Sequence, residues 1–257
     1  PLPVWGDVSS FSYNGDTKNL TPTHTIAWMG QWSDDGLKFY TGRTNTKTIY
    51  EWDASTAFDV STITFSKSQS IPQNANGVKN IKWYNNGLKA IIGGWASKDY
   101  YQYTASTAFD VSTLTYDSVT YFGGGSQSAC MFWSYDGMIC YFGSGGNVVY
   151  RHDATVAYDI STLSSTNNSS AITGAGTHGI AIDPSGTKMW LLDDVGTIRQ
   201  YTLSTAWDIQ NTSWSYDSIS LDVSAQGTKM YDMDVNYDGD LITLTDNSLS
   251  SVFQYSI

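Results

Sequence analysis

The chain has 257 residues and a formal net charge of −11 at pH 7, with 40% hydrophobic, 14% aromatic and 14% charged residues. Its 10 Trp and 18 Tyr exclude a disordered chain, and its acidic charge argues against a nucleic-acid partner. No apolar run approaches the length of a membrane span, so we expect no membrane insertion. Glu51 is the only glutamate, and abundant Thr, Tyr, Val and Gly favour strands and turns.

The first recognisable element, Trp-Gly-Asp-Val-Ser-Ser at residues 5–10, recurs along the chain. The related string Ser-Thr-Ala-Phe-Asp-Val-Ser-Thr stands at 55–62 and 106–113, and variants stand at 155–162 and 204–211. The marker aspartates of these five strings are 49 to 52 residues apart. They are Asp7, Asp59, Asp110, Asp159 and Asp208. We interpret their carboxylates as turn formers that accept hydrogen bonds from the backbone N–H groups that follow.

Between the markers, each repeat predicts four strands. A turn that ends in Gly separates the first strand from the second, a third strand leads to the marker string, and a more polar strand follows it. Four short antiparallel strands in a repeat of this length are typical of a β-propeller blade. We therefore expect an all-β, five-bladed β-propeller as a single domain over 1–257. Its predicted blades are about 24–71, 77–123, 128–172, 177–222 and 229–257, with residues 8–20 completing the last blade and closing the ring.

The repeats resemble those of the YVTN and NHL class of β-propellers. The resemblance lies in the Gly-ending turn, the apolar strand after it, and a Tyr-Gln-Tyr strand that leads into the marker string, as at 101–110. The repeats are also similar to repeat proteins of tailed-phage virions and of secreted bacterial proteins. This resemblance implies a virion or extracellular location and a protein or glycan partner. It implies no catalytic residue, because the class contains structural, ligand-binding and enzymatic members.

One repeat departs from the others in its acidic residues. Residues 234–239 read Asp-x-Asn-x-Asp-Gly, the opening of an EF-hand calcium loop, although the twelfth position holds Thr245 in place of Glu. Two carboxylates on one face of an inner strand need a cation or a basic partner. A bound Ca²⁺ would satisfy them, and so would pairing with Lys79 or Lys82; the ordinary alternative is a solvated turn. The predicted calcium ligands are Asp232, Asp234, Asn236 and Asp238.

Three tryptophans are candidate ligand-binding residues, because they are not repeated from blade to blade and an aromatic ring can stack on a sugar. They are Trp28, Trp95 and Trp214. No G-x-S-x-G string or metal-binding His pair occurs, and Glu51 stands where other blades carry Gln or Arg. The sequence therefore favours a non-enzymatic binding or structural module of a virion or an extracellular assembly. The alternatives are a carbohydrate-binding propeller and a lactonase- or hydrolase-type propeller with a metal in its channel.

The two cysteines fall on one predicted hairpin. A tight turn at Asp136-Gly137 places Cys140 opposite Trp133 and directs Cys130 to the other face of the sheet. This register predicts two buried thiols without a disulfide, and it leaves the redox compartment open.

Overall fold

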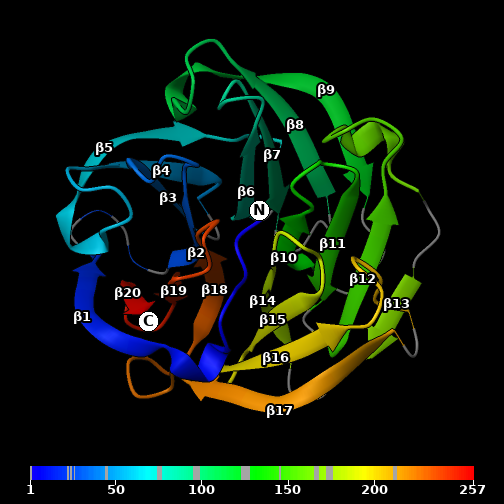
Figure 1. Cartoon of the computed structure of the whole chain (residues 1–257). Coiled ribbons are helices and arrows are strands. Elements are labelled where there is room, and N and C mark those ends of the chain that lie inside the picture. The colour runs from blue at the N-terminus through cyan, green and yellow to red at the C-terminus, as the bar shows by residue number, and fades with distance from the viewer. Residues whose placement is uncertain are drawn as a thin grey trace.

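The structure is a computed structural model of the whole chain. It describes residues 2–21, 23, 25, 27–43, 46–73, 77–94, 99–122, 128–144, 146–164, 168–171, 176–210 and 213–257. These residues form five four-stranded antiparallel sheets, which stand around a central axis as the blades of a propeller (Figure 1). The predicted all-β, five-bladed fold is confirmed.

The strands of each blade run from the axis to the rim in a fixed order. Blade 1 contains β2 (Ala27–Trp32), β3 (Lys38–Arg43), β4 (Thr48–Ala54) and β5 (Ile63–Ser70). Blade 2 contains β6 (Val78–Tyr84), β7 (Lys89–Gly94), β8 (Asp99–Ala105) and β9 (Leu114–Phe122). Blade 3 contains β10 (Ser128–Trp133), β11 (Ile139–Ser144), β12 (Val148–Asp153) and β13 (Asn168–Ala171). Blade 4 contains β14 (Thr177–Ile182), β15 (Lys188–Asp193), β16 (Thr197–Leu203) and β17 (Trp214–Asp222).

Blade 5 joins the two ends of the chain. Its inner strands are β18 (Met230–Val235), β19 (Leu241–Asp246) and β20 (Ser251–Ser256), and its outermost strand is β1 (Ser12–Asn19). β1 pairs antiparallel with β20, from Ser12 opposite Ser256 to Asn19 opposite Ser251. The innermost strands β2, β6, β10, β14 and β18 contact one another in this cyclic order. The predicted ring closure by the N-terminal strand is therefore confirmed, and β20 has no open edge.

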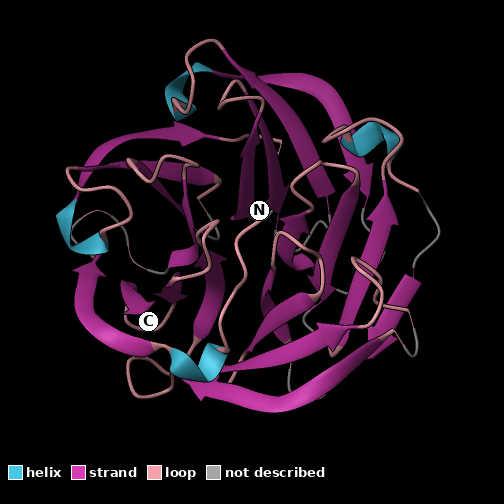
Figure 2. Cartoon of the chain, in the orientation of Figure 1, coloured by secondary structure: helices cyan, strands magenta, loops and turns pink. Residues whose placement is uncertain are grey.

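A short 3-10 helix precedes the outermost strand of four blades (Figure 2). These helices are η1 (Val8–Ser10), η2 (Val60–Thr62), η3 (Val111–Thr113) and η4 (Ile160–Thr162). The marker aspartates Asp59, Asp110 and Asp159 cap η2 to η4, each accepting a hydrogen bond from the N–H two residues later at 2.9 Å. Asp208 accepts the same bond from Gln210. Asp7 differs, because its side chain accepts no capping bond from η1 and contacts Gln200 Nε2 at 3.1 Å in its place.

The apolar core lies between neighbouring blades. Tyr40 and Ile49 of blade 1, for example, pack in one buried cluster with Ile81, Trp83 and Ile92 of blade 2. Because each blade buries both of its faces against its neighbours, the inner strands are apolar on both sides. This explains the nearly continuous apolar runs of the sequence.

A hydrogen-bonding side chain at one position of the third strand fastens most blades to the next blade. Glu51 Oε2 accepts a bond from Val111 N of blade 2 at 2.9 Å. Gln254 Oε1 of blade 5 accepts one from Val60 N of blade 1 at 3.1 Å, and Gln200 Oε1 of blade 4 accepts one from Val8 N at 3.0 Å. We call this contact the latch. It explains why Gln replaces Glu51 at equivalent positions, since both side chains offer an acceptor oxygen.

Both cysteines behave as the sequence predicts. Cys140 pairs with Trp133 across the β10–β11 hairpin, and both thiols are free and buried. In the described part of the chain, no helix has the length and apolar character that a membrane crossing requires.

Candidate functional site

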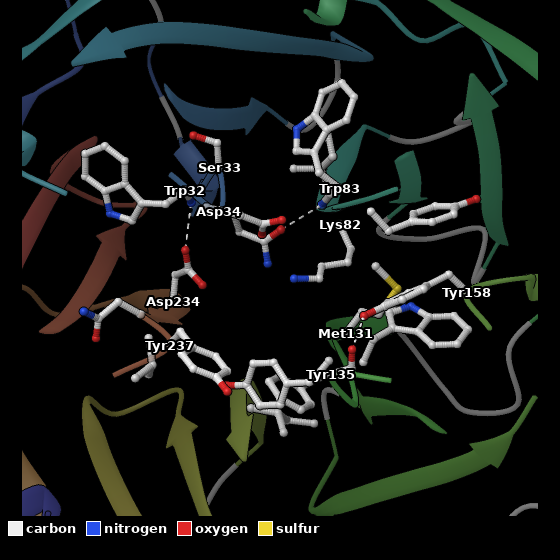
Figure 3. A pocket seen from close by; sticks show the side chains of 18 of the residues that line it. Trp32, Ser33, Asp34, Lys82, Trp83, Met131, Tyr135, Tyr158, Asp234 and Tyr237 are labelled. Carbon is white, nitrogen blue, oxygen red and sulfur yellow. Dashed lines mark hydrogen bonds between the residues drawn. The ribbon is translucent and has the colours of Figure 1, made fainter. Parts of the chain in front are cut away.

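A cavity of about 660 Å³ opens at one mouth of the central channel (Figure 3). The ends of the innermost strands and the hairpin turns that follow them form its walls. Blades 1, 2, 3 and 5 supply nearly all of the lining, and blade 4 contributes Ile180. This size and concave shape are typical of a site for a small ligand.

Five equivalent positions of the innermost strands surround the channel beneath this cavity. In cyclic order from blade 5 they are Asp234, Gln31, Lys82, Phe132 and Ala181. The first four line the cavity, whereas Ala181 is buried in the core. We call these five positions the floor of the cavity. An acid, an amide and an amine stand on one side of the floor, and the two residues on the other side are apolar.

Two of the polar floor residues are held by the backbone of the next blade. Asp234 Oδ2 accepts a hydrogen bond from Trp32 N at 2.7 Å, and Gln31 Oε1 accepts one from Ile81 N at 3.2 Å. Burial raises the pKa of Asp234 to about 6, although the Trp32 N–H bond and the Lys82 charge oppose this rise. Both side chains are thus fixed through one atom and keep a second polar atom for other partners.

Aromatic side chains form the walls above the floor. Tyr135 and Tyr237 stand in the hairpin turns of blades 3 and 5, are 38% and 48% exposed, and meet edge to face at 5.1 Å between ring centroids. Tyr158 and Tyr84 stack on each other at 5.1 Å on the blade 2 and 3 side. Trp5 Nε1 donates to the carbonyl oxygen of Tyr237 at 3.2 Å, which ties that turn to the N-terminal segment.

Deeper in the channel, a β-bulge interrupts every innermost strand and adds one residue to it. The side chains of four bulge residues, Trp28, Lys79, His178 and Tyr231, lie close together. Lys79 Nζ is 6.0 Å and 5.5 Å from the ring centroids of Trp28 and Tyr231, and it donates to their carbonyl oxygens. Burial lowers the pKa of Lys79 to about 8 and that of His178 to about 3. This cluster lies toward the end of the innermost strands that is opposite the cavity.

The four predicted calcium ligands lie at different depths. Asp232 is buried, accepts a hydrogen bond from Gly30 N at 3.0 Å, and lies within electrostatic reach of Lys79; burial raises its pKa to about 7. Asn236 caps the hairpin turn by accepting from Leu241 N at 3.1 Å, and Asp238 is exposed in that turn. No three His, Cys, Asp or Glu side chains gather as a metal site within the described ranges. Lys79 acts electrostatically on Asp232, and the Lys82 charge acts on Asp234 without forming an ion pair within 4.0 Å, so the lysine alternative has support chiefly at Asp232, while calcium stays a prediction.

The two predicted ligand-binding tryptophans that the structure describes lie in different parts of the propeller. Trp28 belongs to the bulge cluster in the channel. Trp214 lies on β17 and packs on Tyr201 at 4.8 Å, far out on blade 4. Trp95 falls outside the described residues.

The sequence interpretation missed Tyr135 and Tyr237. A signal for them was available, because the same turn position carries Asp34, Asn85 and Pro184 in the other blades.

A scan against models of protein families finds no match to this chain, and a search of curated proteins finds no significant relative. The β-propeller fold therefore rests on the structure, and the likeness to YVTN and NHL repeats stays a resemblance of the sequence pattern.

Proposed function

We propose that this β-propeller is a non-enzymatic binding module and that the cavity at the channel mouth holds a saccharide. The observation that carries the proposal is the pair of exposed tyrosines, Tyr135 and Tyr237, over a polar floor. A sugar presents apolar C–H faces together with hydroxyl groups, so a site for it needs aromatic surface and hydrogen-bonding atoms side by side.

The floor supplies such atoms on one side of the cavity. Asp234 keeps a carboxylate oxygen beyond its bond to Trp32, and Gln31 keeps its amide nitrogen beyond its bond to Ile81. Because the backbone of the next blade fixes both side chains, a ligand meets them already in position, which lowers the entropy cost of binding.

A virus particle or an extracellular assembly is the wider setting that we propose for this module. The support is the resemblance of the repeats to YVTN and NHL propellers and to repeat proteins of tailed-phage virions. In such a setting, the saccharide would be part of a cell-surface or extracellular glycan.

The proposal is tested by a glycan array followed by calorimetric titration of the best ligand. We expect Tyr237→Ala to weaken binding by about tenfold or more, because it removes an exposed ring from the cavity wall. Tyr216→Ala is the control, since Tyr216 is 38% exposed, compared with 48% for Tyr237, but lies on the outer strand β17. The proposal is wrong if no glycan binds, or if the two variants bind equally well.

A further inference from the structure

Lys82 breaks a pattern that its neighbours on the channel floor follow. Asp234 and Gln31 each accept a backbone N–H bond from the next blade, and so link blade 5 to blade 1 and blade 1 to blade 2. A lysine has no acceptor atom, so Lys82 cannot make this contact with blade 3. This floor position links blades 5 and 1 to the next blade by a hydrogen bond, but in blade 2 it makes no such link.

Most other partly buried cations have an acidic partner. Six have a carboxylate within 4.0 Å: Lys38, Lys67, Lys89, Arg151, Lys188 and Arg199. Among the described residues, Lys18, Arg43 and Lys47 are also partly buried and have no such ion pair, but none of them lines the cavity. Buried Lys79 donates to two carbonyl oxygens. The Lys82 side chain is half-buried and extends into the cavity (Figure 3). Its ammonium acts on Asp234 only at longer range, and makes no hydrogen bond or ion pair within 4.0 Å with any residue that the structure describes. A partly desolvated ammonium without a partner favours an anionic ligand.

We propose that the saccharide is acidic and that Lys82 binds its carboxylate or sulfate group. This inference rests on the proposed function and adds the charge of the ligand to it. Tyr135 belongs to blade 3, the neighbour of blade 2, and lines the same cavity as Lys82, so one sugar can contact both the ring and the ammonium.

Two acids also face the cavity, and they define the other end of the ligand. Asp234 lies two blades away from Lys82 and is held by Trp32 N, and Asp34 lies on the exposed turn of blade 1. Carboxylates accept hydrogen bonds from hydroxyl groups, so this side suits the neutral part of the sugar. The charges of the floor therefore orient the ligand, with its acidic group toward blade 2.

The test compares wild type with Lys82→Gln, which places in blade 2 the residue that blade 1 already has at Gln31. Calorimetry uses a uronic-acid oligosaccharide, a sulfated oligosaccharide and their neutral parent. We expect wild type to bind one of the acidic probes about tenfold tighter than the neutral one, and Lys82→Gln to lose this preference while it keeps neutral binding. Lys18→Gln on the outer strand β1 removes the same charge outside the cavity and should change neither affinity.

The outcomes separate this inference from the proposed function. If Lys82→Gln weakens the binding of the uronate alone, or of the sulfated probe alone, the result supports the inference and identifies the acidic group. The inference is overturned if wild type binds the neutral sugar more tightly than both acidic probes, or if Lys82→Gln keeps the full preference for an acidic probe. Either result leaves the saccharide proposal standing. Absence of binding to all three probes and to the array overturns both.

Discussion

Replacement of Glu51 tests whether the latch holds neighbouring blades together. Glu51 is fully buried; its Oε2 accepts the hydrogen bond from Val111 N, and its Oε1 accepts one from Lys38 Nζ at 2.6 Å. Glu51→Ala removes both acceptors and leaves the buried N–H of Val111 without a partner. Glu51→Gln keeps an acceptor oxygen, as Gln254 does for Val60. The two variants therefore separate the hydrogen bond from the charge.

The structure sets the size of each effect. An unpaired buried N–H and one lost methylene group together lower the free energy of unfolding by about 2–4 kcal/mol in Glu51→Ala. Lys38 is 27% exposed and still pairs with Asp53 at 2.8 Å, so the loss of charge in Glu51→Gln costs only about 1 kcal/mol. For a chain of this size, these values correspond to a Tm lower by about 10 °C for Ala and about 3 °C for Gln.

Thermal and urea unfolding followed by tryptophan fluorescence measure both changes. Asp53→Asn is the control, because it removes the half-exposed partner of Lys38 and leaves the contact with Val111 intact. The latch is refuted if Glu51→Gln is as unstable as Glu51→Ala, since the ion pair with Lys38 would then account for the whole effect. It is equally refuted if Glu51→Ala unfolds like wild type.

Two further predictions concern titratable groups. Because burial raises the pKa of Asp234 from its ordinary value to about 6, the folded state binds a proton more tightly, and its contribution to stability is lost as the pH rises through 6. Asp234→Asn should reduce the fall in the free energy of unfolding between pH 4.5 and pH 8, measured by urea unfolding; an unchanged fall would contradict this. Burial also raises the pKa of both thiols, so we expect Cys130 and Cys140 to react with a disulfide reagent such as DTNB only after unfolding in guanidinium. Rapid reaction of the folded protein would show that the thiols are accessible.

The repeat made the fold predictable, because its signals are local. Gly36 adopts a positive φ of 69° in its hairpin turn, and Asp59 caps the helix that follows, so a few adjacent residues specify each contact. The closure of β1 on β20 followed from counting strands along the period. These features depend on chemistry that each repeat carries within itself.

The site was less predictable, because it depends on differences between blades that lie far apart in the sequence. The bulge shifts Lys79 and Trp28 into the channel, and a shift of one residue reverses the face of a side chain, so strand alternation alone misplaces them. Tyr135 and Tyr237 are about 100 residues apart, and only the closure of the ring brings their side chains into contact.

Three joints of the ring have the latch, and at a fourth Arg151 of blade 3 donates a hydrogen bond to the carbonyl oxygen of Trp207 of blade 4. Gln102 occupies the latch position of blade 2, yet its side-chain oxygen is buried without a hydrogen-bond partner among the described residues. Blades 2 and 3 meet there through rings such as Tyr84 on Tyr158, which also line the cavity. This seam between blades 2 and 3 therefore relies on the packing of apolar and aromatic side chains. A molecule bound between Lys82 and Tyr135 would contact both blades and add a link between them.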